Sequence, residues 1–438
     1  MRRVLFSLLI SLLWLGSLTA AALAQAAGAK GTDISGAWIL IELFPDEAHT
    51  HRMSLQVAGN KITGHSGQSK IEGTIDGSAI TLKWLTPDGR VDATYTGNQQ
   101  DGALKGEGDW GGVKLQWNAR RPATRPEGGP RTHAFTPTQF HRTFSYAIPP
   151  ALRIFPGDTV KTRSVDAGGR DENSVRRSMG GNPLTGPFYV EGAIPGDTLV
   201  IKLNRVRTNR DWAQSGQMIM ANALDPWSLM NMKRAQNFSS RWNLDSEKGI
   251  AYLEKPTDPL KGFTVPLQPM LGCVGVAPPG RDVIRTGDSG VFGGNMDYNQ
   301  IREGTTVYLP VFHDGALLFM GDGHAAQGDG ELTGDALETS MEFEFTVDVI
   351  SEKSIGTPRA ENAEYLMAIG IGGSLDQALQ RATTEMARWL EGDYKLNSTE
   401  SAMILGFAVK YDDADLVGTQ VSIVAKIPKT ALAQLKRQ

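Results

Sequence analysis

Short runs of alternating apolar and polar residues, separated by glycine-containing turns, constrain the fold of this chain most strongly. In the clearest run, residues 341–349, apolar side chains occupy the odd positions and polar ones the even positions. A period of two is typical of a strand that buries one face and exposes the other. The 50 glycines among 438 residues supply many tight turns. We therefore expect a mainly β protein.

The pattern divides the chain into two β-rich parts. Residues 32–121 contain short alternating runs and hairpin turns, which predict a small all-β accessory domain, either a barrel or a sandwich. Residues 122–137 contain four prolines without hydrophobic periodicity and are predicted to be a linker. Residues 138–438 begin with strands. They end with a helix capped by Ser374, a second helix near 400–409 and a final strand, which together form an appended α+β section.

The N-terminus has the pattern of a cleavable signal peptide over residues 1–24. Arg2 and Arg3 precede an apolar stretch, and residues 22–24 offer a small-x-small cleavage site that ends at Ala24. The apolar stretch is short for a membrane span, so no stable membrane anchor is expected, although an uncleaved anchor is the alternative. The mature protein is therefore predicted to be periplasmic or secreted.

Composition limits the partners and the chemistry. The formal net charge is -4, which gives no electrostatic argument for binding to nucleic acid. Cys273 is the single cysteine, so no internal disulfide forms, and its apolar neighbours favour a buried structural role over a nucleophile. The chain has no His-Glu-x-x-His zinc helix and no Gly-x-Ser-x-Gly elbow. Residues 287–290 resemble a serine-protease loop, but no matching histidine segment precedes them.

Two glycine-rich segments gather polar residues that suit a metal ion. Residues 293–297 and 321–331 together contain one histidine, four acids and two amides. Such an oxygen-rich set suits Zn²⁺ with mixed ligands, or Ca²⁺, Mg²⁺ or Mn²⁺. A glycine-rich loop with solvated acids is an equally good interpretation of the spacing alone. His49 and His51 form a second candidate pair, but a solvated loop is favoured there because no acid or third histidine lies at ligand spacing.

From about residue 138 onward, the chain resembles the acetamidase/formamidase family. The segments that carry the resemblance are residues 182–193, 272–278, 293–297, 309–311 and 321–331, followed by Glu338. The resemblance implies a β-sandwich amidohydrolase that cleaves short amides to a carboxylate and ammonia. It also implies a divalent metal, zinc and/or calcium, which would polarise the amide carbonyl and activate a water molecule.

The resemblance also suggests roles for individual residues. The metal ligands it implies are Asp166, Asp297, His324 and Glu338. Glu191 is the candidate general base, and Asn182 and Asn295 are candidates to donate hydrogen bonds to the substrate carbonyl. Asp322, Asp329 and Glu331 would instead orient His324 from a second layer.

Alternative functions stay open from the sequence. A metal-dependent hydrolase could cleave another C–N bond, such as a lactam, and the same scaffold could be a non-catalytic metal- or ligand-binding protein. Residues 209–243 are rich in tryptophan and methionine. At a pocket they would favour a larger, more apolar amide as the small-molecule substrate; otherwise they belong to the core or to a homo-oligomer interface.

Overall fold

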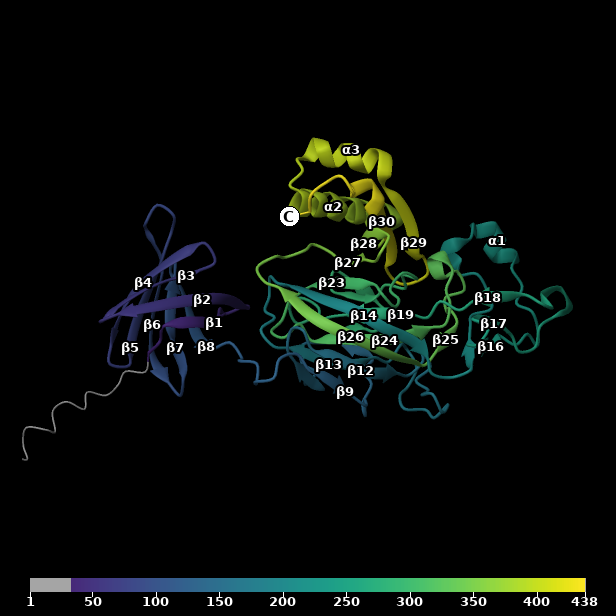
Figure 1. Cartoon of the computed structure of the whole chain (residues 1–438), viewed down its shortest axis with the longest axis horizontal. Helices are drawn as coiled ribbons and strands as arrows, with labels where there is room; N and C mark the ends of the chain where they lie inside the picture. Colours follow the sequence, from purple (N-terminus) through teal and green to yellow (C-terminus); the bar gives the residue numbers. More distant parts are fainter. Residues whose placement is uncertain (1–32, 438) are drawn as a thin grey trace, which may run out of the picture. The chain divides into compact units, whose positions relative to one another are not determined.

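The computed structural model describes residues 33–437. The predicted signal peptide, residues 1–24, lies outside the described residues. The chain divides between Arg121 and Pro122 into two compact units, which are described separately below (Figure 1). Within the described residues, no helix combines the length and the apolar character that a membrane crossing requires.

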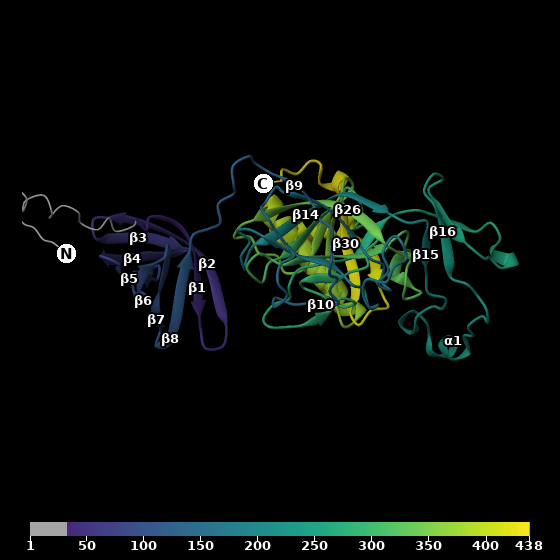
Figure 2. The same ribbon diagram turned by 90° about the horizontal axis from the view of Figure 1, so that it is seen from below.

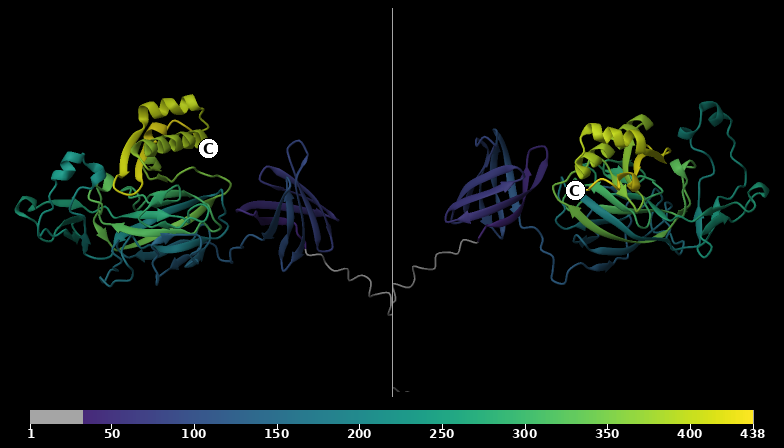
Figure 3. Two further views of the ribbon diagram at one scale, coloured as in Figure 1. Left: turned by 180° about the vertical axis from the view of Figure 1, so that it is seen from behind. Right: turned by 45° about the horizontal axis from the view of Figure 1, so that its top comes forward.

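The first unit is a closed eight-stranded barrel in which each strand pairs with the next and β1 pairs with β8 (Figure 3). Its strands are β1 (Gly36–Leu43), β2 (Ala48–Ala58), β3 (Lys61–Ser66), β4 (Ser69–Asp76), β5 (Ala79–Leu85), β6 (Val91–Gln100), β7 (Ala103–Trp110) and β8 (Val113–Arg120). Glycine is required inside this wall, because a Cβ at Gly106 would lie 1.8 Å from the Thr96 carbonyl oxygen. Large side chains such as Trp38, Leu82 and Trp117 fill the interior.

One local expectation in the barrel is wrong. His49 and His51 lie within strand β2 and not in a solvated loop. They are brought opposite strand β1, where Glu42 pairs with His49 and Leu40 pairs with His51. The neighbouring strand β1 therefore supplies an acid, Glu42, that lies outside ligand spacing of the two histidines in the sequence.

The second unit is a sandwich of two large sheets (Figure 1). The central path of the first sheet is β18 (Thr264–Pro266), β17 (Ile250–Leu253), β16 (Arg241–Asp245), β15 (Trp212–Gln214), β25 (Glu338–Thr339), β24 (Leu318–His324), β19 (Met270–Gly275), β22 (Gly293–Asn295) and β21 (Ser289–Gly290). Strand β13 (Thr185–Val190) joins this sheet beside β24, and β11 (Leu152–Ile154) joins beside β13. A separate two-stranded sheet pairs β10 (Thr143–Phe144) with β20 (Ile284–Arg285).

The second large sheet runs β29 (Lys410–Asp415), β30 (Val421–Pro428), β28 (Tyr365–Gly372), β27 (Arg359–Glu361), β23 (Thr306–Pro310), β14 (Thr198–Thr208), β26 (Met341–Ile350), β12 (Thr159–Ser164) and β9 (Thr132–Ala134). Strand β26 has the expected alternation, with Phe343, Phe345 and Val347 buried. These side chains belong to one core cluster with Leu271, Val274 and Met320 of the first sheet, so the core lies between the sheets.

In the part of the second unit that the structure describes, the α-helices are α1 (Pro226–Asn231, labelled in Figure 2), α2 (Leu375–Tyr394) and α3 (Ser398–Ala408). Ser374 caps α2, as expected, and Asn397 forms a capping box with Glu400 at α3. The apolar face of α2 packs on β28 and β30 through Met386, Trp389 and Leu390. Short 3₁₀ turns are Ala221–Ala223, Asp258–Leu260, Asp329–Glu331 and Lys429–Leu432. The mainly β fold, with a sandwich and a small helical section, is confirmed.

Part of the segment predicted as a linker is bound to the second unit. Residues 132–134 form β9, which pairs in parallel with β12. Arg125 donates to Asp158 Oδ1 at 2.7 Å, and the same oxygen accepts from the Arg131 backbone amide. Because Asp158 organises this turn, its structural role agrees with its position in a Pro-Gly-Asp turn.

Candidate metal centre and active site

Four neighbouring strands of the first sheet of the sandwich carry the candidate site. Strand β22 contributes Asn295, and β19 contributes Gly272. Strand β24 contributes Asp322 and His324, and β25 contributes Glu338. The register places His324 directly opposite Glu338. Asp322 and His324 are two residues apart in β24, which places both side chains on the same face of the sheet. The site is thus built on paired backbone and not on an isolated loop.

His324 lies at the centre of the cluster. Its Nε2 atom is 3.2 Å from Glu338 Oε1, 3.7 Å from Asp322 Oδ2 and 4.0 Å from Asp297 Oδ1. Glu331 joins the same group, since its carboxylate lies within 4.8 Å of ligand atoms of His324 and Glu338. The His324 imidazole therefore lies beside four carboxylates, three of which are measured from its Nε2 atom.

Gln327 fixes the orientation of the His324 ring. The Gln327 Nε2 atom donates to the backbone carbonyl of Asp297 at 2.5 Å, so its Oε1 atom is directed at His324 Nδ1 at 2.8 Å. Because an amide oxygen only accepts, Nδ1 carries the proton and donates it. This leaves Nε2, on the carboxylate side, as the nitrogen that can bind a metal.

The carboxylates are buried and incompletely satisfied. Asp297 and Asp322 are 1% and 2% exposed, and Glu338 is 7% exposed. Asp297 Oδ1, Asp322 Oδ1 and Glu338 Oε2 are buried oxygens without a hydrogen-bond partner. Buried charges are normally paired or coordinate a cation, because removing them from water costs several kcal/mol each, an order-of-magnitude value. The three carboxylates that carry these oxygens lie around one imidazole, an arrangement that fits a bound divalent metal.

The two asparagines hold these carboxylates in place. Asn182 Nδ2 donates to Asp322 Oδ2 and to Asn295 Oδ1, both at 2.9 Å. Asn295 Nδ2 in turn donates to Asp297 Oδ2. Both amide hydrogens of Asn182 are therefore used within the cluster, which makes it a positioning residue in this structure. Asn295 retains one amide hydrogen for another acceptor.

Gly272 leaves the space into which the cluster projects. A Cβ atom at this position would lie 2.3 Å from Asp297 Oδ1, 2.8 Å from His324 Cε1 and 2.9 Å from Asp322 Oδ2. The Gly272 carbonyl oxygen also accepts the backbone amides of Met296 and Asp297. Glycine is thus required here because the carboxylates occupy the place of a side chain.

The close carboxylates shift one another's titration. Burial raises the pKa of Asp297 well above its ordinary value, and the neighbouring Glu331 and Asp322 add to this. Burial also raises the pKa of Glu331 to about 8 and that of Glu338 to about 7. Burial opposes the charged form of His324, but Glu338 and Asp322 outweigh this and raise its pKa. The metal-free cluster therefore holds protons near neutral pH, and a cation would replace them.

The structure does not bring two of the expected residues into this cluster. Asp166 Oδ2 lies 2.7 Å from Arg210 Nη1, and its other oxygen accepts the Arg170 backbone amide. Arg210 Nη2 donates to the Glu338 carbonyl oxygen, so the Asp166–Arg210 pair contacts the backbone of a site residue and not its carboxylate. The Asp166 carboxylate is thus occupied by a guanidinium and is not grouped with His324.

Glu191 lies toward the other end of the sheet. Its Oε1 accepts from Arg153 Nε at 2.6 Å. Strand β13 pairs with β24 through Phe188 and Leu318, and Glu191 continues beyond that pair, away from His324. Leu318 to His324 is six residues along β24, which corresponds to about 20 Å at about 3.3 Å per residue. The predicted base and the predicted metal ligands are therefore separated.

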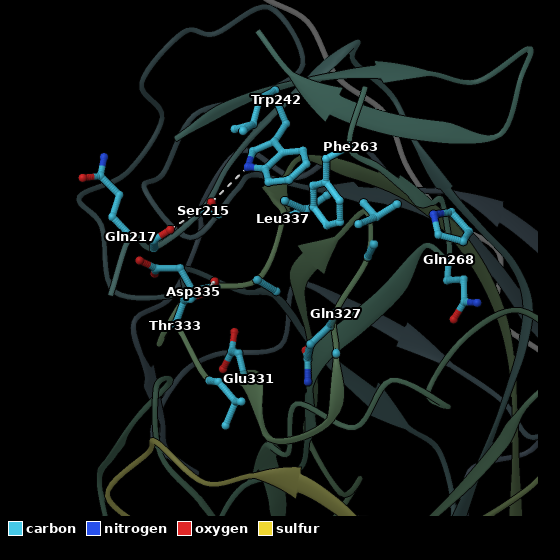
Figure 4. Close-up of a pocket in the computed structure, with 18 of the residues that line it drawn as sticks. Ser215, Gln217, Trp242, Phe263, Gln268, Gln327, Glu331, Thr333, Asp335 and Leu337 are labelled. Atoms are coloured by element: carbon cyan, nitrogen blue, oxygen red, sulfur yellow. Dashed lines mark hydrogen bonds between the residues drawn. The ribbon is translucent and has the colours of Figure 1, made fainter. Parts of the chain in front are cut away.

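A pocket of about 620 Å³ opens beside the cluster (Figure 4). Trp242, Phe263 and Leu337 form an apolar side, and Gln327 and Glu331 lie on a polar side. Trp242 Nε1 donates to Ser215 Oγ at 3.0 Å, which fixes its ring. Glu331 and Gln327 both contact the cluster and line the pocket, so the pocket leads to the candidate metal centre.

Several residues of the site differ in role from those expected. Asp322 and Glu331 lie among the candidate ligands and not in a second layer, and Gln327 is the residue that orients His324. Asp329 is exposed and accepts from Asn299 instead. The period-two relation of Asp322 and His324 is the sequence signal that could have identified Asp322. No local pattern marks Gly272, whose role arises from three side chains on two other segments.

Comparisons with known proteins agree in the region that carries the site. The model of the acetamidase/formamidase family matches residues 279–412. The acetamidase of Mycolicibacterium smegmatis is 24% identical over 271 residues, which cover 48% of this chain and 66% of that protein. The match spans between 60% and 66% of the length of the curated relatives.

Solved structures extend the likeness to nearly the whole of the second unit. The acetamidase of Yersinia enterocolitica has a TM-score of 0.59 at 28% identity, covering 72% of this chain and 96% of that chain. The acetamidase of Bacillus halodurans also has a TM-score of 0.59 at 28% identity, covering 69% of this chain and 99% of that chain.

Proposed function

Because the second unit of this chain belongs to the acetamidase/formamidase family, we propose that the protein hydrolyses the C–N bond of a small-molecule amide with the help of a divalent metal. The observation that carries the proposal is the convergence of buried carboxylates on His324 Nε2. A nucleophilic serine or cysteine is not required by this scheme. Cys273 is also poorly suited to act as a nucleophile, since it is fully buried and burial raises the pKa of its thiol.

We propose that Asp297, Asp322, His324 and Glu338 hold the metal, with Asp322 replacing Asp166 in the set expected from the sequence. Zinc is favoured by the imidazole nitrogen, whereas calcium is favoured by the many carboxylate oxygens. When bound, such a metal polarises the amide carbonyl and activates a water molecule. Gln327 holds the His324 ring, Asn182 donates to Asp322, and Asn295 donates to Asp297, so three of the ligand side chains are fixed in place.

Glu331 is our candidate for the proton carrier, in place of Glu191. It lines the pocket and approaches His324, and its raised pKa of about 8 lies near a working pH at which proton transfer is efficient. In this scheme Glu331 accepts a proton from the attacking water and gives it to the departing nitrogen. Water oxygen bonds to the carbonyl carbon, the C–N bond breaks, and a carboxylate and ammonia or an amine leave.

The pocket favours an amide larger than acetamide. A volume of about 620 Å³ lies in the range that encloses drug-sized ligands, whereas acetamide has only a handful of non-hydrogen atoms. Trp242 and Phe263 lie with ring centroids 6.2 Å apart, and Leu253 and Leu337 also line this side. We therefore propose an acyl or amine group with an aromatic or branched apolar end.

The test is ammonia or amine release from a panel that includes formamide, acetamide, phenylacetamide and a lactam, with the bound metal measured by elemental analysis. We expect hydrolysis of at least one linear amide by the metal-loaded protein and none after chelation. Hydrolysis of the lactam alone would favour the other C–N bond, and bound metal without any hydrolysis would favour a binding protein.

Two variants separate the roles of the acids. Glu331→Gln should lower kcat by about 100-fold or more while most of the metal is retained. Glu247→Gln, a change at an exposed glutamate that does not line the pocket, should leave kcat unchanged. An unchanged kcat in Glu331→Gln would remove Glu331 from the mechanism.

We also propose that the protein acts outside the cytoplasm. The support is the signal-peptide pattern of residues 1–24, which predicts a mature N-terminus at Gln25. Cell fractionation and N-terminal sequencing of the secreted or periplasmic form test this proposal. A protein that retains Met1 in the soluble cytoplasmic fraction would contradict it. The formation of a homo-oligomer stays a prediction.

A further inference from the structure

The barrel unit contains a second cluster of metal-binding side chains. Glu42 pairs with His49 across the β1–β2 hairpin, and His51 is two residues further along β2. Because alternate residues share a face, both histidines lie on the same side of the hairpin as Glu42. One ligand atom from each of the three side chains lies within 4.8 Å of the other two.

Glu42 is a buried acid that the barrel core does not explain. It is 2% exposed, on a face of β1 otherwise occupied by core residues such as Leu40. Its Oε1 atom accepts from the Tyr95 hydroxyl at 2.5 Å. Its Oε2 atom is buried without a hydrogen bond and lies 3.3 Å from His51 Nε2. A buried carboxylate with a free oxygen requires a cationic partner, and it is directed at an imidazole.

The space beside Glu42 is small and accessible. A cavity of about 90 Å³ is lined by Glu42, His51, Trp84, Tyr95 and Trp110, among others. It corresponds to about three water molecules at about 30 Å³ each. The side chains of His49 and His51 are 38% and 47% exposed, so an ion can enter from solvent. The rest of the interior is filled, so the cavity suits a hydrated ion better than a lipid-like ligand.

We propose that Glu42, His49 and His51 form a binding site for one divalent transition-metal ion of the zinc class. Two imidazoles and one carboxylate are a common ligand set for Zn²⁺, and the remaining positions would hold water or an external ligand. Glu47 Oε1 lies 2.6 Å from His49 Nε2, so His49 would bind the ion through Nδ1 while Nε2 donates to Glu47, a contact that supports metal-bound imidazoles. This site is independent of the proposed amidase centre.

The test counts the zinc ions bound to the full mature chain by equilibrium dialysis. We expect His49→Gln/His51→Gln to bind one zinc fewer per chain than the wild type, or to bind it at least about 100-fold more weakly. Glu42→Gln should do the same, because it removes the carboxylate ligand. It preserves the shape of the side chain and the contact with Tyr95. The control is His65→Gln, which removes an exposed histidine of the same barrel and should leave the count unchanged.

The rate of amide hydrolysis is measured on the same samples and should be equal in all variants. Because the zinc count and the hydrolysis rate are separate readouts, failure of the proposed function is distinguished from failure of the barrel zinc site. Quenching of tryptophan fluorescence by Cu²⁺ gives a second readout, since Trp84 and Trp110 line the cavity. The same zinc count and the same quenching in wild type and His49→Gln/His51→Gln would overturn the proposal. That double variant alters exposed side chains, so it carries the test even if Glu42→Gln fails to fold.

Discussion

Gly272→Ala is the sharpest perturbation of the proposed metal centre, because it adds one methyl group at the point on which the ligands converge. The new Cβ would lie 2.3 Å from Asp297 Oδ1 and 2.9 Å from Asp322 Oδ2, whereas ordinary contacts begin at 3.4 Å. The two oxygens would have to retreat by 1.1 Å (3.4 − 2.3) and 0.5 Å (3.4 − 2.9). Metal–ligand distances hold to within about 0.2 Å, so at least one ligand is lost.

Relaxation of the backbone offers little relief. The amide of Asp297 is hydrogen-bonded to the Gly272 carbonyl oxygen at 3.1 Å, so the added methyl group and the displaced acid are tied to each other. We expect the metal to bind about 100-fold more weakly, equivalent to about 2.8 kcal/mol. Overpacking should lower the free energy of unfolding of the metal-free protein by about 1–3 kcal/mol.

The assay is calorimetric titration of chelator-treated protein with zinc, together with urea unfolding without metal. The matched control is Gly321→Ala in the neighbouring strand, where the new methyl group meets Leu184 Cδ2 at 3.0 Å, the far end of a flexible side chain. It should bind zinc with an affinity within roughly threefold of the wild type. Wild-type zinc affinity in Gly272→Ala would refute the assignment of the metal to this cluster.

Three further predictions follow from the same geometry. Phe263→Ala should lower kcat/KM by about 10-fold or more for phenylacetamide and leave that for acetamide unchanged, with the exposed Phe407→Ala as control. The metal-free protein should lose stability as pH rises from about 4.5 to 8, because the raised pKa of Glu338, about 7, means that its protonated carboxyl stabilises the fold and its charged form does not. Glu338 alone should contribute on the order of 3 kcal/mol to this loss. In urea unfolding, zinc should reduce the dependence of the unfolding free energy on pH, and a metal-free protein that is more stable at pH 8 would contradict the prediction. Asp322→Asn should raise the melting temperature of the metal-free protein while weakening zinc binding. A lower melting temperature together with weaker zinc binding would point to a structural role for Asp322.

The sequence predicted the elements that depend on local pattern. The alternation of residues 341–349 identified β26, and the capping residue Ser374 identified the start of α2. His324 and Asp297 were identified as parts of one centre through the family resemblance, and His324 Nε2 lies 4.0 Å from Asp297 Oδ1. These predictions needed either a few consecutive residues or a motif that the family shares.

Partners that depend on sheet register could not be predicted in this way. Whether Asp166 meets a metal or Arg210 depends on contacts between distant segments, and the structure pairs it with Arg210 at 2.7 Å. Glu191 lies in a segment of the family motif, yet the direction of β13 carries it away from His324. Glu42 and His51 are nine residues apart, and only the antiparallel pairing of β1 with β2 brings them to 3.3 Å.

Backbone conformation supplies independent support for the proposed metal centre. Among the described residues, eleven non-glycine residues have positive φ, and Asn182, Asp297, Asp322 and Glu331 account for four of them, with φ between 41° and 57°. Such conformations are uncommon outside glycine and persist only where the surroundings impose them. A fold selected for stability alone would not collect four of them beside buried, incompletely bonded carboxylates, because each feature is destabilising. Both costs are offset together if a cation binds among these residues, and the amide hydrolysis that we propose for this site would use the same cation.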